Sequence, residues 1–166
     1  IAVAEDLQRR GLTTPKQLGI LGGSLGGMLV QVAMQQRPEL FGAVVSQVPL
    51  SDMKRYHRML AGASWMAEYG DPDQPSDWEV IGAYSPYHNS KQDAQYPPIL
   101  YTSSTRDDRV HPAHARKMVA LMQSQGHKVL YWENGEGGHA GAANSAQAAS
   151  MWALSYSFLI DQLMKQ

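Results

Sequence analysis

The sequence predicts an α/β protein: a mostly parallel sheet with helices on both faces, in a three-layer αβα sandwich. Short apolar runs of strand length alternate along the chain with longer helical segments, which is the order typical of strand–helix–strand units. Glycines bound several of these runs. The polar residues that could carry chemistry follow the runs directly, so they are expected to gather at one edge of the sheet.

Composition is that of an ordinary globular domain. The 166 residues are 43% hydrophobic and 17% charged, with a formal net charge of −1 and scattered Lys and Arg. We expect no nucleic-acid partner and no basic membrane patch. The absence of cysteine excludes disulfides and a Cys nucleophile. No apolar run approaches the roughly 20 residues of a membrane span, so we expect a soluble protein, cytoplasmic or periplasmic.

The first half of the chain supplies two strands. Residues 2–10 predict a helix that Gly11 ends. Residues 17–22 predict a buried parallel strand, because a short apolar run is bounded there by glycine. A glycine-rich corner follows, and a helix is expected over 28–36. Residues 43–48 predict the next buried strand.

The second half repeats the pattern after an excursion. Residues 50–90 predict irregular chain with short helical pieces, passing over the sheet edge where α/β enzymes often build pockets. Strands are expected at 99–103 and 128–132, with a helix between them over 111–125. A glycine-rich loop then leads into a final helix over 143–164.

The strongest local signal is GGSLGG at residues 22–27, which fits the G-x-S-x-G nucleophile elbow of the α/β-hydrolase fold. A sharp strand-to-helix turn would expose Ser24 in strained geometry, and side chains at Gly22 and Gly26 are expected to clash. The N–H of Leu25 would then serve as an oxyanion donor. The alternative is a phosphate-binding turn, but the G-x-G-x-x-G spacing and the P-loop lysine are both missing.

A serine nucleophile needs a base and an acid, which α/β-hydrolases carry in the order Ser, Asp, His. His139 follows the last predicted strand in a glycine-rich loop. Asp107 and Asp108 both follow the strand before it, and spacing alone leaves either as the acid or as a helix cap.

The other histidines are less well placed for catalysis. His111 and His114 are expected to be surface or capping residues at a helix start. No His, Asp or Glu cluster has the spacing of a metal site such as H-E-x-x-H, so no metal and no other cofactor are expected.

Taken as a set, the motifs resemble the catalytic domain of the prolyl oligopeptidase family. The similarity covers most of the chain, from about residue 10 onward, in family order. It rests on GGSLGG (22–27), QRPELFGAVVSQVPLSDM (36–53), WMAEYG (65–70), YSPYHN (84–89), QYPPIL (95–100), TRDDRVHPAHARK (105–117) and GGHAGA (137–142).

The resemblance assigns roles that spacing leaves open. It implies that Asp107 is the triad acid, that Arg109 holds a substrate carbonyl, and that Trp65 stacks on a substrate proline. It also implies further pocket walls, at Tyr69, Leu50 and Val110. The alternatives are a salt bridge of Arg109 with Asp107 or Asp108, and ordinary core packing for the pocket walls.

Two departures qualify the resemblance. Leu25 stands where the members closest to prolyl oligopeptidase itself have Asn, which alters a wall near the substrate but keeps the backbone donor. The chain opens as if within a helix, so we expect residues 1–166 to be a single domain, the C-terminal part of the catalytic domain. The upstream strands, a β-propeller and the Tyr hydroxyl that supplies the second oxyanion donor would lie outside it.

The expected function is therefore that of a serine-type peptidase acting on short peptides, after proline or another small residue, through an acyl-enzyme. Its partners would be peptide substrates and the missing N-terminal part of the same protein. The fragment alone should be nearly inactive and should self-associate through an exposed sheet edge. Two rivals are a carboxylesterase with the same triad and a non-catalytic binding module that keeps the fold.

Overall fold

The computed structural model describes residues 1–164. Its centre is a four-stranded sheet in the order β1-β2-β3-β4, and each neighbouring pair is parallel. The strands are β1 (Gly19–Gly23), β2 (Ala43–Gln47), β3 (Ile99–Ser104) and β4 (Val129–Asn134). Because all four run in one direction, the residues that follow them lie along one edge of the sheet.

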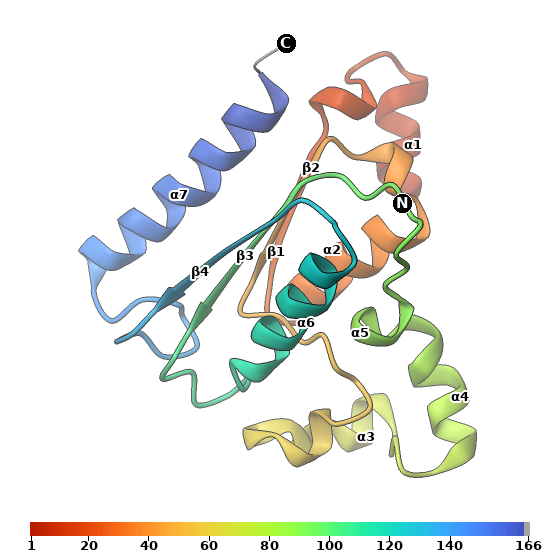
Figure 1. The fold of residues 1–166 in the computed structure, drawn as a ribbon, viewed down its shortest axis with the longest axis vertical. Helices are drawn as coiled ribbons and strands as arrows, with labels where there is room; N and C mark the ends of the chain where they lie inside the picture. The colour runs from red at the N-terminus through yellow and green to blue at the C-terminus, as the bar shows by residue number, and fades with distance from the viewer. Residues whose placement is uncertain (165–166) are drawn as a thin grey trace.

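Helices cover both faces of this sheet (Figure 1). On one face lie α2 (Leu25–Gln36) and α6 (Ala113–Ser124), and on the other lies α7 (Ser145–Leu163). The first helix, α1 (Ala2–Arg9), packs near the start of the chain's first strand. The predicted αβα arrangement is confirmed. The helix α2 begins earlier than expected, because the glycines of the predicted corner already belong to its first turn.

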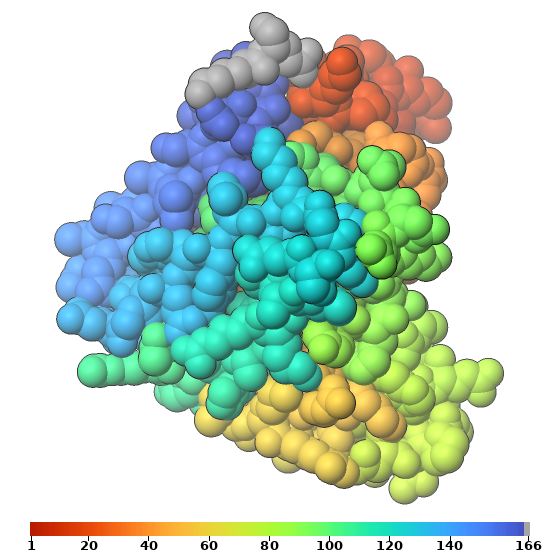
Figure 2. Space-filling model, viewed as in Figure 1, coloured from red at the N-terminus to blue at the C-terminus, as the bar shows by residue number. Residues whose placement is uncertain are grey.

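The segment between β2 and β3 is mostly helical but broken into short pieces. It contains 3₁₀ turns at Tyr56–Arg58 and Leu60–Trp65, then α3 (Met66–Tyr69), α4 (Pro75–Tyr84) and α5 (Pro86–Asn89). Two further 3₁₀ turns lie outside it, at Pro15–Gln17 and Pro38–Leu40. The atoms of the segment between β2 and β3, coloured yellow to yellow-green, form the lower end of the molecule in Figure 2. This segment supplies the walls of the pocket described below.

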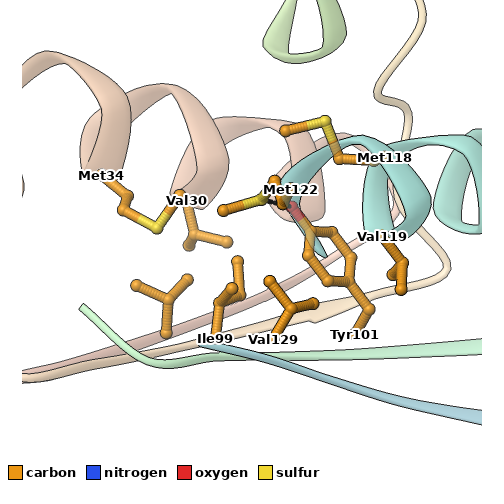
Figure 3. Packing of buried hydrophobic residues seen from close by; sticks show 9 residues of the cluster. Val30, Met34, Ile99, Tyr101, Met118, Val119, Met122 and Val129 are labelled. Atoms are coloured by element: carbon orange, nitrogen blue, oxygen red, sulfur yellow. Dashed lines mark hydrogen bonds between the residues drawn. The ribbon is translucent and has the colours of Figure 1, made fainter. Parts of the chain in front are cut away.

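The largest apolar cluster lies between the sheet and the helices α2 and α6 (Figure 3). Side chains from both helices meet side chains from the strands, and most are fully buried: Val30, Met34, Val44, Ile99, Tyr101, Met118, Val119, Met122 and Val129. Burial of a side chain of this size contributes roughly 1.5–3 kcal/mol. This packing fixes α2, and with it the residue that precedes α2, against the sheet.

The opposite face of the sheet packs on α7. Ala43, Val45 and Leu100 point toward this helix and are buried with Phe158. Alternate residues of each strand therefore face opposite helical layers, as expected for a sheet buried on both sides.

The two outermost strands of the sheet, β1 and β4, each have one side without a neighbouring strand among residues 1–164. Beside β1 lies an apolar hollow lined in part by Val3 and Leu29, which are 73% and 66% exposed. No helix in this part of the chain has the length and apolar character needed to cross a membrane.

Candidate active site

Ser24 occupies the turn between β1 and α2 with φ 57° and ψ −120°. This positive φ is rare for a residue with a side chain and stores strain at the turn. Two contacts enforce it. A Cβ on Gly22 would lie 2.2 Å from the carbonyl oxygen of Gly26, so only glycine fits there. The backbone N–H of Ser24 donates to the carbonyl of Gln47 at 2.9 Å, which ties the turn to β2.

The prediction for Gly26 is wrong. A Cβ built at Gly26 meets nothing within 4 Å, because this residue faces open space in the first turn of α2. The close contact belongs instead to Gly27, where a Cβ would lie 2.9 Å from Cβ of Pro49 and 3.0 Å from the carbonyl of Gln47. The elbow therefore needs glycine at Gly22 and Gly27, whereas Gly26 could carry a side chain.

His139 reaches Ser24 from the loop between β4 and α7. Its Nε2 lies 3.0 Å from Oγ of Ser24. Asn134, the last residue of β4, holds the loop by donating to the carbonyl of Gly141 at 3.0 Å and to the side chain of Gln147 at 2.7 Å. Gly141 has φ +76°, so the chain turns back at a position suited to glycine.

Asp107 meets the other side of the same imidazole. Its Oδ2 lies 2.9 Å and its Oδ1 3.1 Å from Nδ1 of His139. The Oδ1 also accepts the backbone N–H groups of Arg109 at 2.9 Å and Val110 at 2.8 Å, which fix the carboxylate. Asp108 is exposed and forms no hydrogen bond with His139. Of the two aspartates that spacing left open, only Asp107 contacts the histidine.

The three side chains thus form one hydrogen-bonded line. Because an ionised carboxylate only accepts, the proton on His139 belongs on Nδ1, and Nε2 is free to accept from the Ser24 hydroxyl. The N–H of Leu25 is at the first position of α2, where no intrahelical partner exists. The arrangement can move a proton from the hydroxyl to the imidazole and stabilise an oxyanion beside the helix start.

A small pocket opens beside Ser24. Its walls come from α2, the segment after β2 and the loop after β3, and they are Ser24, Leu25, Leu50, Trp65, Glu68, Tyr69 and Arg109. Trp65 and Tyr69 are partly exposed, whereas Leu50 is 3% exposed. Val110, 2% exposed, packs behind them in the same apolar cluster and does not line the pocket.

A family model for the prolyl oligopeptidase family matches residues 1–166. The chain belongs to this family. It is 52% identical to an uncharacterized peptidase, y4nA, of Sinorhizobium fredii over 98% of its own length and 22% of that protein. It is 41% identical to the prolyl endopeptidase of Dictyostelium discoideum over 78% of this chain and 17% of that protein.

Solved structures of the prolyl oligopeptidase family agree with the fold. The chain superposes on one of two prolyl endopeptidases studied for inter-domain dynamics with a TM-score of 0.95 and 46% identity, covering 99% of this chain and 25% of that one. It matches a post-proline cleaving enzyme from Rickettsia typhi with a TM-score of 0.92 and 41% identity, covering 98% and 24%. The chain therefore spans about a quarter of the length of these relatives, and the predicted family and fold are confirmed.

Glu68 is a pocket residue of this family member that the sequence reasoning missed. It brings a carboxylate to the same pocket as the guanidinium of Arg109. Burial, helped by the neighbouring Glu68, raises the pKa of Tyr69, so this phenol stays protonated and can donate a hydrogen bond. The stretch WMAEYG (65–70) could have indicated Glu68, because this acidic residue lies in the sequence between the two aromatic pocket walls Trp65 and Tyr69.

The prediction that His114 is a surface or capping residue is also wrong. This side chain is 1% exposed, and its Nδ1 accepts the backbone N–H groups of Ser51 at 3.2 Å and Asp52 at 3.0 Å. Burial lowers the pKa of His114 to about 4, because a charge there would be desolvated. His111 lies just before the N-cap residue Pro112, is partly exposed, and accepts the N–H of Ala113 at 3.0 Å.

Asp52 is a second buried ionisable group close to Leu50. It is fully buried and binds Lys117 and, at 2.9 Å, Arg55. Burial alone would raise its pKa, but hydrogen bonds from Lys117 and Arg55 hold the pKa below its usual value. The segment that carries Leu50 is thus fixed to α6 by both ionic and neutral contacts.

One group of side chains in the described part of the chain could gather around a cation: His57, Asp71 and Asp73. Arg58 already donates to Asp73 at 2.7 Å and to the ring of His57 at 3.1 Å. A guanidinium therefore occupies the place that an ion would need, and none of the three residues lines the pocket beside Ser24.

Proposed function

We propose that this chain carries the catalytic residues of a serine peptidase, with Ser24 as nucleophile, His139 as general base and Asp107 as the group that orients the imidazole. The observation that supports this most directly is the continuous line of hydrogen bonds, 3.0 Å from Ser24 Oγ to His139 Nε2 and 2.9 Å from His139 Nδ1 to Asp107 Oδ2. A serine hydroxyl at its ordinary acidity needs such a base to attack a carbonyl.

The reaction follows from this line. Ser24 Oγ attacks the substrate carbonyl carbon as its proton passes to Nε2 of His139, and the N–H of Leu25 donates to the resulting oxyanion. Collapse expels the amine, which takes the proton from His139 and leaves an ester on Ser24. Water attacks that ester with His139 again as base, releasing the acid and restoring the hydroxyl. No cofactor enters these steps.

We propose short peptides cleaved after proline as the substrates. The aromatic walls Trp65 and Tyr69 beside Ser24 suit the flat, apolar ring of proline. Relatives named as prolyl endopeptidases and a post-proline cleaving enzyme support the same class. Arg109 is exposed and forms no salt bridge within residues 1–164, so its guanidinium is available to donate to a peptide carbonyl.

We further propose that the 166 residues work within a larger catalytic domain. The chain spans 22% of one relative and 25% of a solved one, which supports this. A second oxyanion donor, the family's Tyr hydroxyl, would then come from outside the chain. Loss of one such donor costs about 10²–10³-fold in rate, so the 166 residues alone should be nearly inactive.

Hydrolysis by the full-length protein tests the proposal. A chromogenic proline amide and p-nitrophenyl acetate are compared on the parent protein, on Ser24→Ala and on Ser124→Ala, which changes an exposed serine bonded only within its own helix. We expect amide hydrolysis that only Ser24→Ala abolishes. Cleavage of the ester without the amide would instead favour a carboxylesterase, and turnover of neither by a folded protein would favour a binding module.

A further inference from the structure

Gln31 is a fully buried amide in the middle of α2. Its Nε2 donates to the carbonyl of Gly27 at 2.9 Å and to the hydroxyl of Ser46 at 3.2 Å. Its Oε1 accepts the hydroxyls of Ser51 and Tyr101, each at 3.0 Å. The amide thus has two donated and two accepted bonds, which matches its full capacity.

The partners of Gln31 belong to segments that carry the site. The first turn of α2 follows Ser24 directly. Ser51 follows the pocket wall Leu50, and Tyr101 lies on β3, whose end leads into Asp107. One amide therefore joins the segments of the nucleophile, the acid and a pocket wall, although it contacts none of those three side chains.

We propose that Gln31 is a positioning residue, which holds the start of α2 at the distance from β3 that the Ser24–His139–Asp107 line requires. This inference rests on the proposed function. Apolar packing alone tolerates sliding, whereas hydrogen bonds fix both distance and direction, and a buried, fully satisfied network does so most firmly. A shift of about 1 Å in catalytic geometry costs about 100-fold in rate.

A purely structural role is the alternative, and the single substitution Gln31→Met cannot separate the two. Gln31→Met would leave the hydroxyls of Ser51 and Tyr101 buried without their acceptor, which destabilises by itself. Replacing all partners by apolar groups of similar shape can be nearly neutral for stability. The informative variant is therefore the combination Gln31→Met, Ser51→Ala and Tyr101→Phe, in which Ser46 still donates to Gly27.

The experiment measures kcat, KM and the denaturation midpoint of the full-length protein with a proline amide. We expect the triple variant to keep the parent midpoint while kcat falls about 10- to 100-fold. KM should change by less than about threefold, because the pocket walls keep their apolar packing around Met53 and Tyr56 when the contact through Ser51 is removed. The control, Gln125→Met with Ser90→Ala, removes an amide–hydroxyl pair far from the site and should leave kcat within about twofold.

Each result decides the matter. A triple variant with the parent midpoint and the parent kcat would overturn the inference and leave the proposed function intact. If the triple variant fails to fold, Tyr101→Phe alone takes its place, since Ser51 still donates to Gln31; a kcat lower by about threefold or more supports the inference, and an unchanged kcat overturns it. A parent protein without amide hydrolysis would overturn both.

Discussion

The carboxylate of Asp107 lies 2.9 Å from Nδ1 of His139, 32 positions later in the chain. Asp107 is held by two backbone N–H groups of its own loop, and its side chain is fully buried. The fixed carboxylate therefore orients the imidazole. The His139 side chain is 24% exposed, and its Nε2 contacts Ser24 Oγ.

Asp107→Asn should lower kcat by about 10⁴-fold with little loss of stability. The amide oxygen can still accept the two backbone N–H groups, but its NH₂ would favour the wrong tautomer of His139. Asp108→Asn, which changes an exposed neighbour, is the matched control. Steady-state kinetics with a proline amide checks this, and less than a tenfold loss in Asp107→Asn would contradict the role assigned to Asp107.

The two glycines around Ser24 should differ sharply in tolerance. Gly22→Ala places a Cβ against the carbonyl of Gly26, so we expect loss of folding or at least about a 100-fold loss of kcat. Gly26→Ala meets nothing and replaces glycine in a helix, which should leave activity near the parent level and stabilise by up to about 1 kcal/mol. Thermal denaturation and kinetics on both variants test this; equal effects would contradict it.

Trp65→Ala should lower kcat/KM for a proline amide by about 10- to 100-fold, mainly through KM, because it removes an aromatic wall beside Ser24. The control is Trp152→Ala, which removes a 39% exposed tryptophan stacked on Tyr156 of α7. A proline amide and a matched alanine amide are compared on each. An unchanged preference for proline in Trp65→Ala would show that this ring does not recognise it.

His114 should make the protein less stable in mild acid. Its folded pKa of about 4 lies below the ordinary value of 6.5, so the unfolded chain binds the extra proton. The stabilisation is complete above pH 6.5 and is lost as the pH falls toward 4; between pH 7 and pH 5 the loss is about 2 kcal/mol.

Chemical denaturation at these two pH values measures the effect on the parent and on His114→Asn, which keeps an acceptor near the position of Nδ1. His127→Asn, at a partly exposed histidine, is the control. We expect the pH dependence to shrink by about 2 kcal/mol in His114→Asn only. The same dependence in all three proteins would assign it to other groups.

The 166-residue chain studied alone should self-associate. The free edge of β1 presents unpaired backbone groups, and the apolar hollow beside it adds exposed surface from Val3 and Leu29. Size-exclusion chromatography should give an apparent mass that rises with concentration, and Leu29→Lys should weaken this rise. A strictly monomeric profile at high concentration would count against the prediction.

Local patterns predicted the strands and the order of the site residues well. The run at 43–48 became β2 (Ala43–Gln47), and the glycine-rich loop does carry His139 to Ser24. These features depend on neighbours in sequence, such as apolar runs, glycine positions and the strand–helix order, so the sequence contains enough to predict them.

Two of the failures, those at Gln31 and His114, share a physical cause. Gln31 is one of three glutamines in a mostly apolar helix, and His114 looks like an exposed residue near a helix start. Each is buried because partners from distant segments satisfy it, 70 positions away for Tyr101 with Gln31 and 62 for Asp52 with His114. Gly26 was misjudged because the space around a turn depends on how the next strand packs, which no local pattern describes.

The most direct test of the central claim is labelling of the full-length protein with a fluorophosphonate, followed by peptide mapping by mass spectrometry. Such probes react with a serine only when a neighbouring base activates it. We expect a single adduct on Ser24, absent from Ser24→Ala and strongly slowed in His139→Ala. An adduct on another serine, or none on Ser24 in a folded protein that binds its peptide substrates, would contradict the account.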